Sequence, residues 1–367
     1  MLTRCTPPQP RASNEWSIRS PGTSETPKDL TMAPGLEATR RIRSGVKVVC
    51  APPGLPDIQP MKPRAHHDGD SEDPLRVPLV IGHRGASGLS PENTLAAFRL
   101  ALALGADGVE MDVQLSADGQ PVVIHDRRVD RTTGGVGAVE RFTANQLSQL
   151  DASASFRRKL AMRPRIRAMA EEAARAFGED RREVSAEAVP TLAAVLELIA
   201  PARPGRIYIE LKTDPSRRRE LLEQTISLVR GSALRESVTL LSFDHDIIKL
   251  AKEMAPRVRT AATFSMAGRT FAPRGIIEAA RRVGAAEVAL HFGLANLRTV
   301  GALHDSDLAV SAWTANSKIL MRRLIAAGVD AIMTNFPNRL IEVINTPRRP
   351  PMFGRRRRKS ALSADSK

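Results

Sequence analysis

From residue 77 onward, short apolar runs alternate with longer segments in which apolar residues recur at every third or fourth position. A short apolar run between turn residues is typical of a buried strand, and the longer spacing is typical of a helix that covers a sheet. The pattern predicts strands near 77–82, 107–113, 206–211, 238–242, 258–263, 286–290, 308–312 and 330–333. It predicts helices near 93–104, 191–200, 217–230, 245–255, 275–282, 295–304, 317–327 and 337–345. Eight strand–helix units in succession indicate an α/β fold, a (β/α)8 TIM barrel.

An open, doubly wound sheet is the alternative architecture for such an alternation. It would place a glycine-rich dinucleotide turn after the first strand, and that turn is missing here. The segment Gly134-Gly135-Val136-Gly137 lacks the Lys-Ser/Thr pair of a nucleotide cradle. We therefore interpret this segment as a loop and keep the barrel.

Three segments fall outside the barrel pattern. Residues 1–73 are rich in Pro, Ser, Thr and charge without sustained periodicity, which predicts a disordered N-terminal extension before a barrel at 74–345. Between about 151 and 189 the alternation gives way to a charged helical segment, which predicts a small helical insertion after the second strand unit. Its basic side either approaches an anionic substrate or lipid, or is a solvated cover. Residues 346–367 read as a basic disordered tail.

The net charge of +15 is unevenly placed, because the tail holds eight Lys and Arg against a single acidic residue. Such a tail either attracts an anionic membrane surface or simply aids solubility. Sequence-specific nucleic-acid binding is not expected, since neither interleaved aromatics nor a recognition helix is evident. Cys5 and Cys50 both precede the barrel, and no segment resembles a signal peptide or membrane span. We expect a cytoplasmic protein, peripheral at a membrane if the tail binds lipid.

Ionisable residues concentrate where the first strands end. His83 and Arg84 follow the first apolar run, Glu110 and Asp112 lie on the second strand, and His125 follows a turn at Asp118-Gly119. Strand side chains alternate between faces, so Glu110 and Asp112 point the same way and can share one cation. Charge buried among Val, Ile and Met is costly unless it is paired or bound to a metal. The cluster therefore indicates a functional site.

The third strand repeats this arrangement with Glu210 and Lys212, again two positions apart. Glu210 would add a third carboxylate to Glu110 and Asp112. Three clustered carboxylates repel one another unless a cation joins them, and ligands that are all oxygen favour Mg2+ or Ca2+ over Zn2+. The alternative is a buried Glu210–Lys212 ion pair.

In a TIM barrel the active site lies at the carboxyl ends of the strands, and all of these candidates fall there. So do three weaker candidates, Ser242, His291 and Trp313. Ser242 either contacts substrate or caps the next helix. His291 and Trp313 either line the substrate or serve the core. Asn93 either orients the His83-Arg84 turn or starts the first helix.

The ordered motifs resemble the glycerophosphodiester phosphodiesterase family: HRGxxxxxPENTxxAF at 83–98, ExD at 110–112, HD at 125–126 and ELK at 210–212. The resemblance covers about 77–345. It implies a barrel, a divalent ion held by the three carboxylates, a lysine that contacts phosphate, and Trp313 beside the glycerol moiety. It also implies attack of the substrate's own glycerol hydroxyl on phosphorus, giving a cyclic phosphate that water opens.

A phosphodiester is anionic, so its cleavage needs charge neutralisation and proton transfer. Arg84 and Lys212 can neutralise phosphate oxygens, and His83 and His125 can act as acid and base. The sequence does not assign which histidine is the base. Two departures, Asn335 where the family usually has Asp and Ala193 where it often has Glu, are expected to lie outside this core set.

The resulting hypothesis is metal-dependent hydrolysis of glycerophosphodiesters to glycerol 3-phosphate and an alcohol. A lysophospholipase D, which would need a long apolar groove beside the site, is one alternative. A catalytically silent barrel that the basic tail tethers to membranes is the other.

Overall fold

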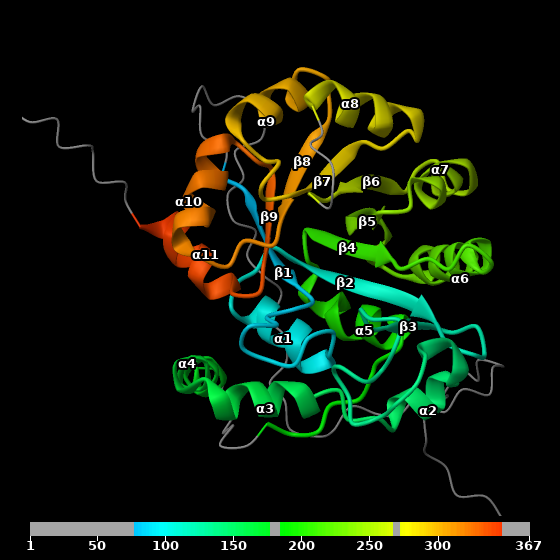
Figure 1. Ribbon diagram of the computed structural model, residues 1–367, viewed down its shortest axis with the longest axis vertical. Coiled ribbons are helices and arrows are strands. Elements are labelled where there is room, and N and C mark those ends of the chain that lie inside the picture. Colours follow the sequence, from blue (N-terminus) through cyan, green and yellow to red (C-terminus); the bar gives the residue numbers. More distant parts are fainter. Residues whose placement is uncertain (1–76, 177–183, 267–271, 347–367) are drawn as a thin grey trace, which may run out of the picture. The chain divides into compact units, whose positions relative to one another are not determined.

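The computed structural model describes residues 77–176, 184–266 and 272–346 (Figure 1). The predicted disordered extension at 1–73 and the basic tail, apart from Thr346, lie outside these described residues. No helix among them has both the length and the apolar character needed to cross a bilayer.

Eight parallel strands close into a barrel, because β1 pairs with β2 on one side and with β9 on the other. A short antiparallel strand, β3, pairs with the outer end of β2 after the predicted turn at Asp118-Gly119. The strands are β1 (Leu79–His83), β2 (Gly108–Leu115), β3 (Pro121–Val123), β4 (Arg206–Leu211), β5 (Val238–Ser242), β6 (Arg259–Phe264), β7 (Glu287–His291), β8 (Ala309–Trp313) and β9 (Ala331–Thr334). The predicted TIM barrel is confirmed.

Eight helices surround the barrel, each following a barrel strand along the chain (Figure 1). They are α1 (Leu95–Ala103), α5 (Leu192–Ile199), α6 (Arg218–Gly231), α7 (His245–Met254), α8 (Pro273–Arg282), α9 (Leu297–His304), α10 (Lys318–Ala327) and α11 (Pro337–Asn345). Their bounds and those of the barrel strands differ from prediction by no more than two residues. A strong apolar period therefore located both kinds of element.

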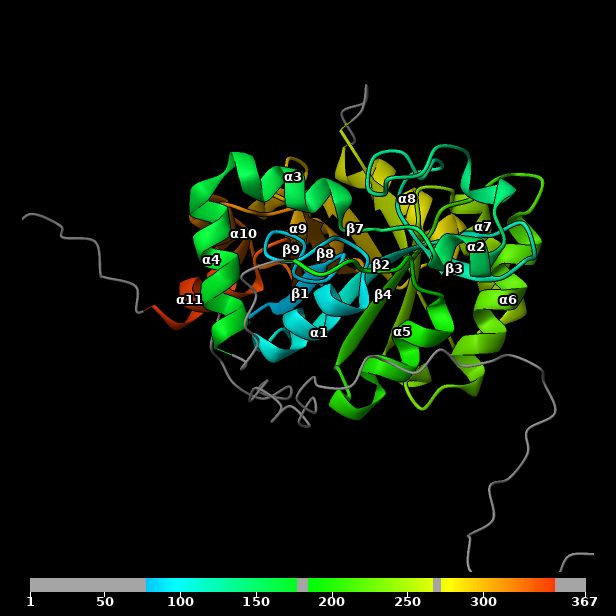
Figure 2. The ribbon, with the colours of Figure 1, turned by 90° about the horizontal axis from the view of Figure 1, so that it is seen from below.

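The predicted insertion contains two helices, α3 (Ala154–Met162) and α4 (Pro164–Arg175), joined at Arg163. Proline lacks an N–H donor and is tolerated in a first helical turn, so Pro164 ends α3 and starts α4 at a sharp corner. In Figure 2, α3 lies at the top of the view and α4 runs down the outside of the barrel. The small helix α2 (Ala144–Ser148) precedes the insertion.

Side chains that point into the barrel form layers, as expected for alternating strands. The middle layer is apolar and includes Ile81, Leu241, Ala261 and Met333. Polar clusters lie on either side of it, one toward the amino ends of the strands and one toward the carboxyl ends. Tyr208 and Glu210, two positions apart on β4, belong to these two clusters. The barrel thus buries one polar cluster toward each end of its strands.

Candidate active site

Three carboxylates meet at the carboxyl end of the barrel, as expected from the sequence. Glu110 and Asp112 extend from β2, and the strand register sets Asp112 beside Glu210 of β4. One oxygen from each residue lies within 4.8 Å of the others, and the three side chains are buried. Burial and the neighbouring carboxylates raise the pKa of Glu110 well above its usual range and that of Glu210 to about 7. The donor set suits an oxygen-preferring divalent cation.

Two basic side chains flank Asp112. Arg84 Nε lies 3.1 Å from Asp112 Oδ2, and Lys212 Nζ lies 3.1 Å from Asp112 Oδ1. Burial alone would raise the pKa of Asp112, but Arg84 and Lys212 outweigh it and hold that pKa well below its usual value. Lys212 also donates to Glu210. The predicted ion-pair alternative is therefore present as one contact within a larger cluster.

The turn that carries Arg84 is held by hydrogen bonds to the site. Arg84 and Asn93 both adopt left-handed backbone conformations, with φ of 57° and 58°. The Arg84 N–H donates to Glu110 Oε2 at 2.9 Å, and the Asn93 N–H donates to the Arg84 carbonyl at 3.1 Å. Asn93 Nδ2 donates to Asp112 Oδ2 at 2.8 Å. Asn93 therefore orients the turn and a carboxylate, whereas the N-cap of α1 is Thr94.

Both candidate histidines lie beside this cluster with Nδ1 already bonded. His83 Nδ1 lies 2.8 Å from Asn335 Oδ1, and His125 Nδ1 lies 2.6 Å from Asp126 Oδ1. Because an amide or carboxylate oxygen only accepts, each Nδ1 carries the proton and each Nε2 keeps its lone pair. Burial lowers the pKa of His83 to about 4 and that of His125 below its usual value, so both imidazoles are neutral at pH 7.

The contact to Asn335 overturns one expectation. The substitution of Asn for the family's Asp was expected to lie outside the core set, but its side chain is the Nδ1 partner of His83. The two residues are 252 positions apart in the chain. They meet because β9 pairs with β1 and closes the barrel.

A chain of hydrogen bonds that the sequence did not reveal links the two sides of the site. Arg84 Nη1 donates to Glu92 Oε1 at 2.9 Å, and Arg131 donates to both oxygens of Glu92 at 2.9 and 2.7 Å. Arg131 Nε also donates to Asp126 Oδ2 at 2.5 Å. Burial opposes ionisation of Glu92, but Arg131 and Arg84 lower its pKa to about 2. The chain joins Arg84 to His125 through ionised groups.

The weaker candidates form a wall beside Lys212. Trp313 makes edge-on contacts with Phe243 and His291, at centroid distances of 5.5 and 5.4 Å. Lys212 Nζ lies 5.8 Å from the centre of the Phe243 ring. Trp313 and His291 are half-buried and Phe243 is exposed, so this aromatic wall borders the mouth of the site.

Ser242, the remaining candidate, is bonded to the backbone. Its hydroxyl donates to the Leu211 carbonyl at 2.8 Å and accepts from the Asp244 N–H at 3.1 Å. The N-cap of α7 is Asp244, not Ser242. Ser242 therefore fastens the end of β5 to the end of β4.

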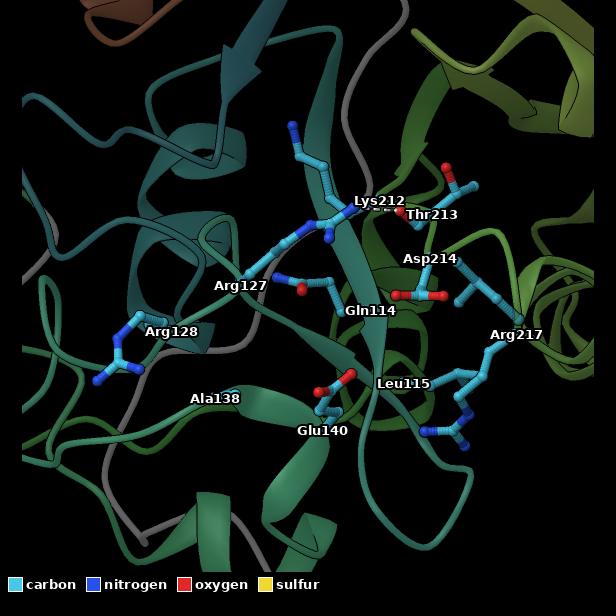
Figure 3. A pocket seen from close by; sticks show the side chains of 11 residues that line it. Gln114, Leu115, Arg127, Arg128, Ala138, Glu140, Lys212, Thr213, Asp214 and Arg217 are labelled. Atoms are coloured by element: carbon cyan, nitrogen blue, oxygen red, sulfur yellow. Dashed lines mark hydrogen bonds between the residues drawn. The ribbon is translucent and has the colours of Figure 1, made fainter.

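A cavity of about 190 Å3 adjoins the site on the outer side of Lys212 (Figure 3). Figure 3 shows the Lys212 ammonium pointing away from the other lining side chains. Arg127 reaches across the cavity and donates to the Thr213 carbonyl at 2.9 Å. Gln114 donates to the carbonyls of Ile124, His125 and Asp126. Gln114, which the sequence did not single out, thus holds the segment that carries His125.

Comparison with known proteins gives matches over most of the described region. The profile of the Glycerophosphoryl diester phosphodiesterase family matches residues 83–339. A glycerophosphodiester phosphodiesterase of Caldanaerobacter subterraneus is 34% identical over 269 residues, covering 72% of this chain and 97% of that protein.

Solved structures agree with this match. An Oleispira antarctica phosphodiesterase, in complex with the product sn-glycerol-3-phosphate, gives a TM-score of 0.61 at 26% identity and covers 74% of this chain and 98% of that one. A glycerophosphodiester phosphodiesterase of Agrobacterium tumefaciens gives a TM-score of 0.56 at 25% identity, covering 72% and 100% of the two chains.

Proposed function

Because the chain belongs to the glycerophosphoryl diester phosphodiesterase family and is an enzyme of that class, we propose how its site hydrolyses glycerophosphodiesters to glycerol 3-phosphate and an alcohol. The observation that carries the proposal is the cluster of three buried carboxylates between two basic side chains and two neutral histidines.

The carboxylates Glu110, Asp112 and Glu210 would hold one divalent cation, Mg2+ or Ca2+. The fit rests on their donors, which are all carboxylate oxygens, and on the raised pKa of two of them. A bound cation would supply Lewis-acid polarisation of a phosphoryl oxygen and offset the repulsion among the carboxylates.

Arg84 and Lys212 would bind the remaining phosphoryl oxygens. The side chain of Arg84 ends in a planar guanidinium, and hydrogen bonds to Glu110 and Asn93 fix the backbone of this residue. The direction from which Arg84 reaches the phosphate is therefore set before substrate binds. Lys212 supplies a second positive charge from the adjacent strand. Together they would stabilise charge on phosphorus in the transition state.

His83 and His125 would move the protons. Each donates its Nδ1 proton to a neighbouring oxygen and keeps a lone pair on Nε2, which suits a base and, after Nε2 takes a proton, an acid. The charge of Asp112 acts on both imidazoles, which supports a role for the two histidines at one bound ester.

Turnover of glycerophosphocholine by the full chain tests the proposal. We expect release of glycerol 3-phosphate with Mg2+ or Ca2+ and loss of release with a chelator. His83→Ala and His125→Ala should each lower turnover by about 10^2- to 10^4-fold. His304→Gln, which alters a surface histidine bonded to Asp330, is the matched control and should keep activity.

Two results would change the proposal. Absence of product with any divalent ion would favour the silent barrel. Faster turnover of lysophospholipids than of glycerophosphocholine would favour the lysophospholipase D alternative. A substrate panel that varies the alcohol and the acyl group separates these readings.

A further inference from the structure

Five of the seven large apolar side chains that are exposed in the described residues lie at the carboxyl end of the barrel strands, whereas Val77 precedes β1 and Val136 lies in the loop after β3. Phe243 and Met266 follow the carboxyl ends of β5 and β6, and Leu297 and Ile319 lie in the first turns of α9 and α10. In a parallel barrel these positions all surround the active-site end. Isolated exposed apolar residues are common, but their concentration around one opening points to an interaction surface.

The corner of the insertion belongs to the same end. Met162, 76% exposed, ends α3, which Figure 2 shows at the top of the view. The N–H of Ser155 in α3 donates to the Thr132 carbonyl at 3.4 Å, and the neighbouring Arg131 bonds Glu92 of the site. The insertion therefore lies beside the loop that borders the mouth of the site.

The three most exposed of these residues lie along one arc of the rim. Leu297 is 71% exposed and Ile319 is 81% exposed. The corner connects to them through neighbouring helices, since Arg339 of α11 contacts Met169 of α4 and α10 packs against both α11 and α9. Figure 1 shows α4, α11, α10 and α9 as successive helices around the barrel.

Each apolar tip on this arc has a basic neighbour in the chain: Arg163 beside Met162, Arg298 beside Leu297 and Lys318 beside Ile319. Lys318 pairs with Glu342, whereas no ion pair joins Arg163 or Arg298 to a carboxylate within the described ranges. Apolar tips flanked by cations match a surface of anionic phosphate over hydrocarbon. A second copy of this positive arc would repel it.

We propose that this arc, comprising Met162, Arg163, Leu297, Arg298, Lys318 and Ile319, docks the enzyme on an anionic phospholipid surface. The apolar side chains would enter the interface while the cations contact lipid phosphates. The proposal rests on the proposed function in one respect: docking through this arc would turn the opening of the proposed catalytic site toward the lipid surface. Docking itself needs no turnover.

Sedimentation of the full chain with vesicles tests the proposal. The probes are vesicles of phosphatidylcholine with phosphatidylglycerol and vesicles of phosphatidylcholine alone. Wild type should bind the first more tightly. The triple variant Met162→Ser/Leu297→Ser/Ile319→Ser and the double variant Arg163→Gln/Arg298→Gln should each lower the partition coefficient by about tenfold or more. Their melting temperatures and glycerophosphocholine turnover should match those of wild type.

Three controls keep the result specific. Val77→Ser and Arg257→Gln remove an exposed apolar and an exposed basic residue away from the arc, and both should bind like wild type. A variant in which the four arginines at 355–358 are replaced by Gln removes most of the basic run of the tail. In this background the triple and the double arc variants should still lower the partition coefficient. If the tail variant alone loses binding, or if neutral vesicles bind equally well, the proposal is wrong. If the full chain binds anionic vesicles through the arc but does not turn over glycerophosphocholine, the proposed function is wrong and the docking proposal still holds.

Discussion

The two ends of the barrel interior each bury charge, but they balance it differently. Toward the amino ends of the strands, the single carboxylate of Glu287 accepts from the Tyr208 hydroxyl at 2.7 Å, and Arg206 Nη1 lies 3.8 Å from it. Toward the carboxyl ends, three carboxylates share two basic neighbours, Arg84 and Lys212. The first cluster pairs one carboxyl group with one cation, whereas the second has one more carboxyl group than it has cations.

The backbone does not distinguish the two ends. Arg84 and Asn93 are left-handed at the carboxyl end, and Arg203 and Asp307 are left-handed in the turns that precede β4 and β8 at the amino end. Clustered like charges with raised pKa values are typical of functional sites. The comparison teaches that burial of charge alone does not mark a site here. The excess of carboxylates over cations marks it.

Removal of one carboxylate from the triad should give the largest effect. Glu110→Gln keeps an acceptor for the Arg84 N–H but removes a metal ligand, so turnover should fall by more than about 10^3-fold. It also removes a repelling charge, so the metal-free protein should gain about 1 kcal/mol of unfolding free energy. Turnover assays and thermal unfolding in chelator measure the two effects. A less stable variant would contradict the repulsion.

At the amino end we expect the opposite result, a loss of stability with little change in turnover. Tyr208→Phe leaves the buried Glu287 without its closest donor, so the free energy of unfolding should fall by about 2 kcal/mol. Turnover should stay near that of wild type, since the Tyr208 hydroxyl bonds Glu287 and takes part in none of the hydrogen bonds described for the three carboxylates. Thr225→Val, at a buried hydroxyl without a hydrogen-bond partner in α6, is the matched control and should not destabilise.

The fold was predictable because strand period and helix period both persist along the chain. Eight apolar runs and eight helical segments define a barrel, and the alternation of side chains put Glu110, Asp112 and Glu210 on the inner face. The same alternation could have revealed the amino-end cluster. Tyr208 precedes Glu210 by two positions, so both had to point inward.

The outer part of the site could not be predicted. Glu92, Asp126 and Arg131 lie in loops, where the path of the backbone decides which side chains meet. Asn335 lies just after a strand, but its contact with His83 depends on which strand closes the barrel and on how far the side chain reaches. Neither the closing strand nor the reach of the side chain can be predicted from the local sequence pattern.

The excess of carboxylates should also make the stability of the metal-free enzyme depend on pH. Burial and Asp112 raise the pKa of Glu210 from 4.5 to about 7, so its contribution is fully present below pH 4.5 and is lost as the pH rises through about 7. The lowered pKa values of His83 and His125 act with the opposite sign between about 4 and 6.5. Comparison of wild type with Glu210→Gln cancels the histidine contribution.

The variant should therefore gain about 1 to 2 kcal/mol of stability relative to wild type between pH 4.5 and 7. Urea unfolding at several pH values in chelator measures this difference. Saturating Mg2+ or Ca2+ should reverse it, because a cation that binds only the folded triad stabilises wild type more than the variant. A flat difference curve would mean that the carboxylates do not repel in the folded state.

The smallest effect should come from the loops around the carboxyl end. Arg131→Gln breaks the link between Glu92 and Asp126 but leaves Glu92 on Arg84 and Asp126 on His125. Groups that only orient direct ligands and proton carriers typically change activity by about 10- to 100-fold, and we expect a loss in kcat at the lower end of that range. Arg128→Gln breaks the exposed pair with Asp130 in the same loop and should leave kcat unchanged. Equal kcat losses in the two variants would contradict a role for the hydrogen-bond chain through Arg131. Such a result would indicate that the rigidity of the loop determines kcat.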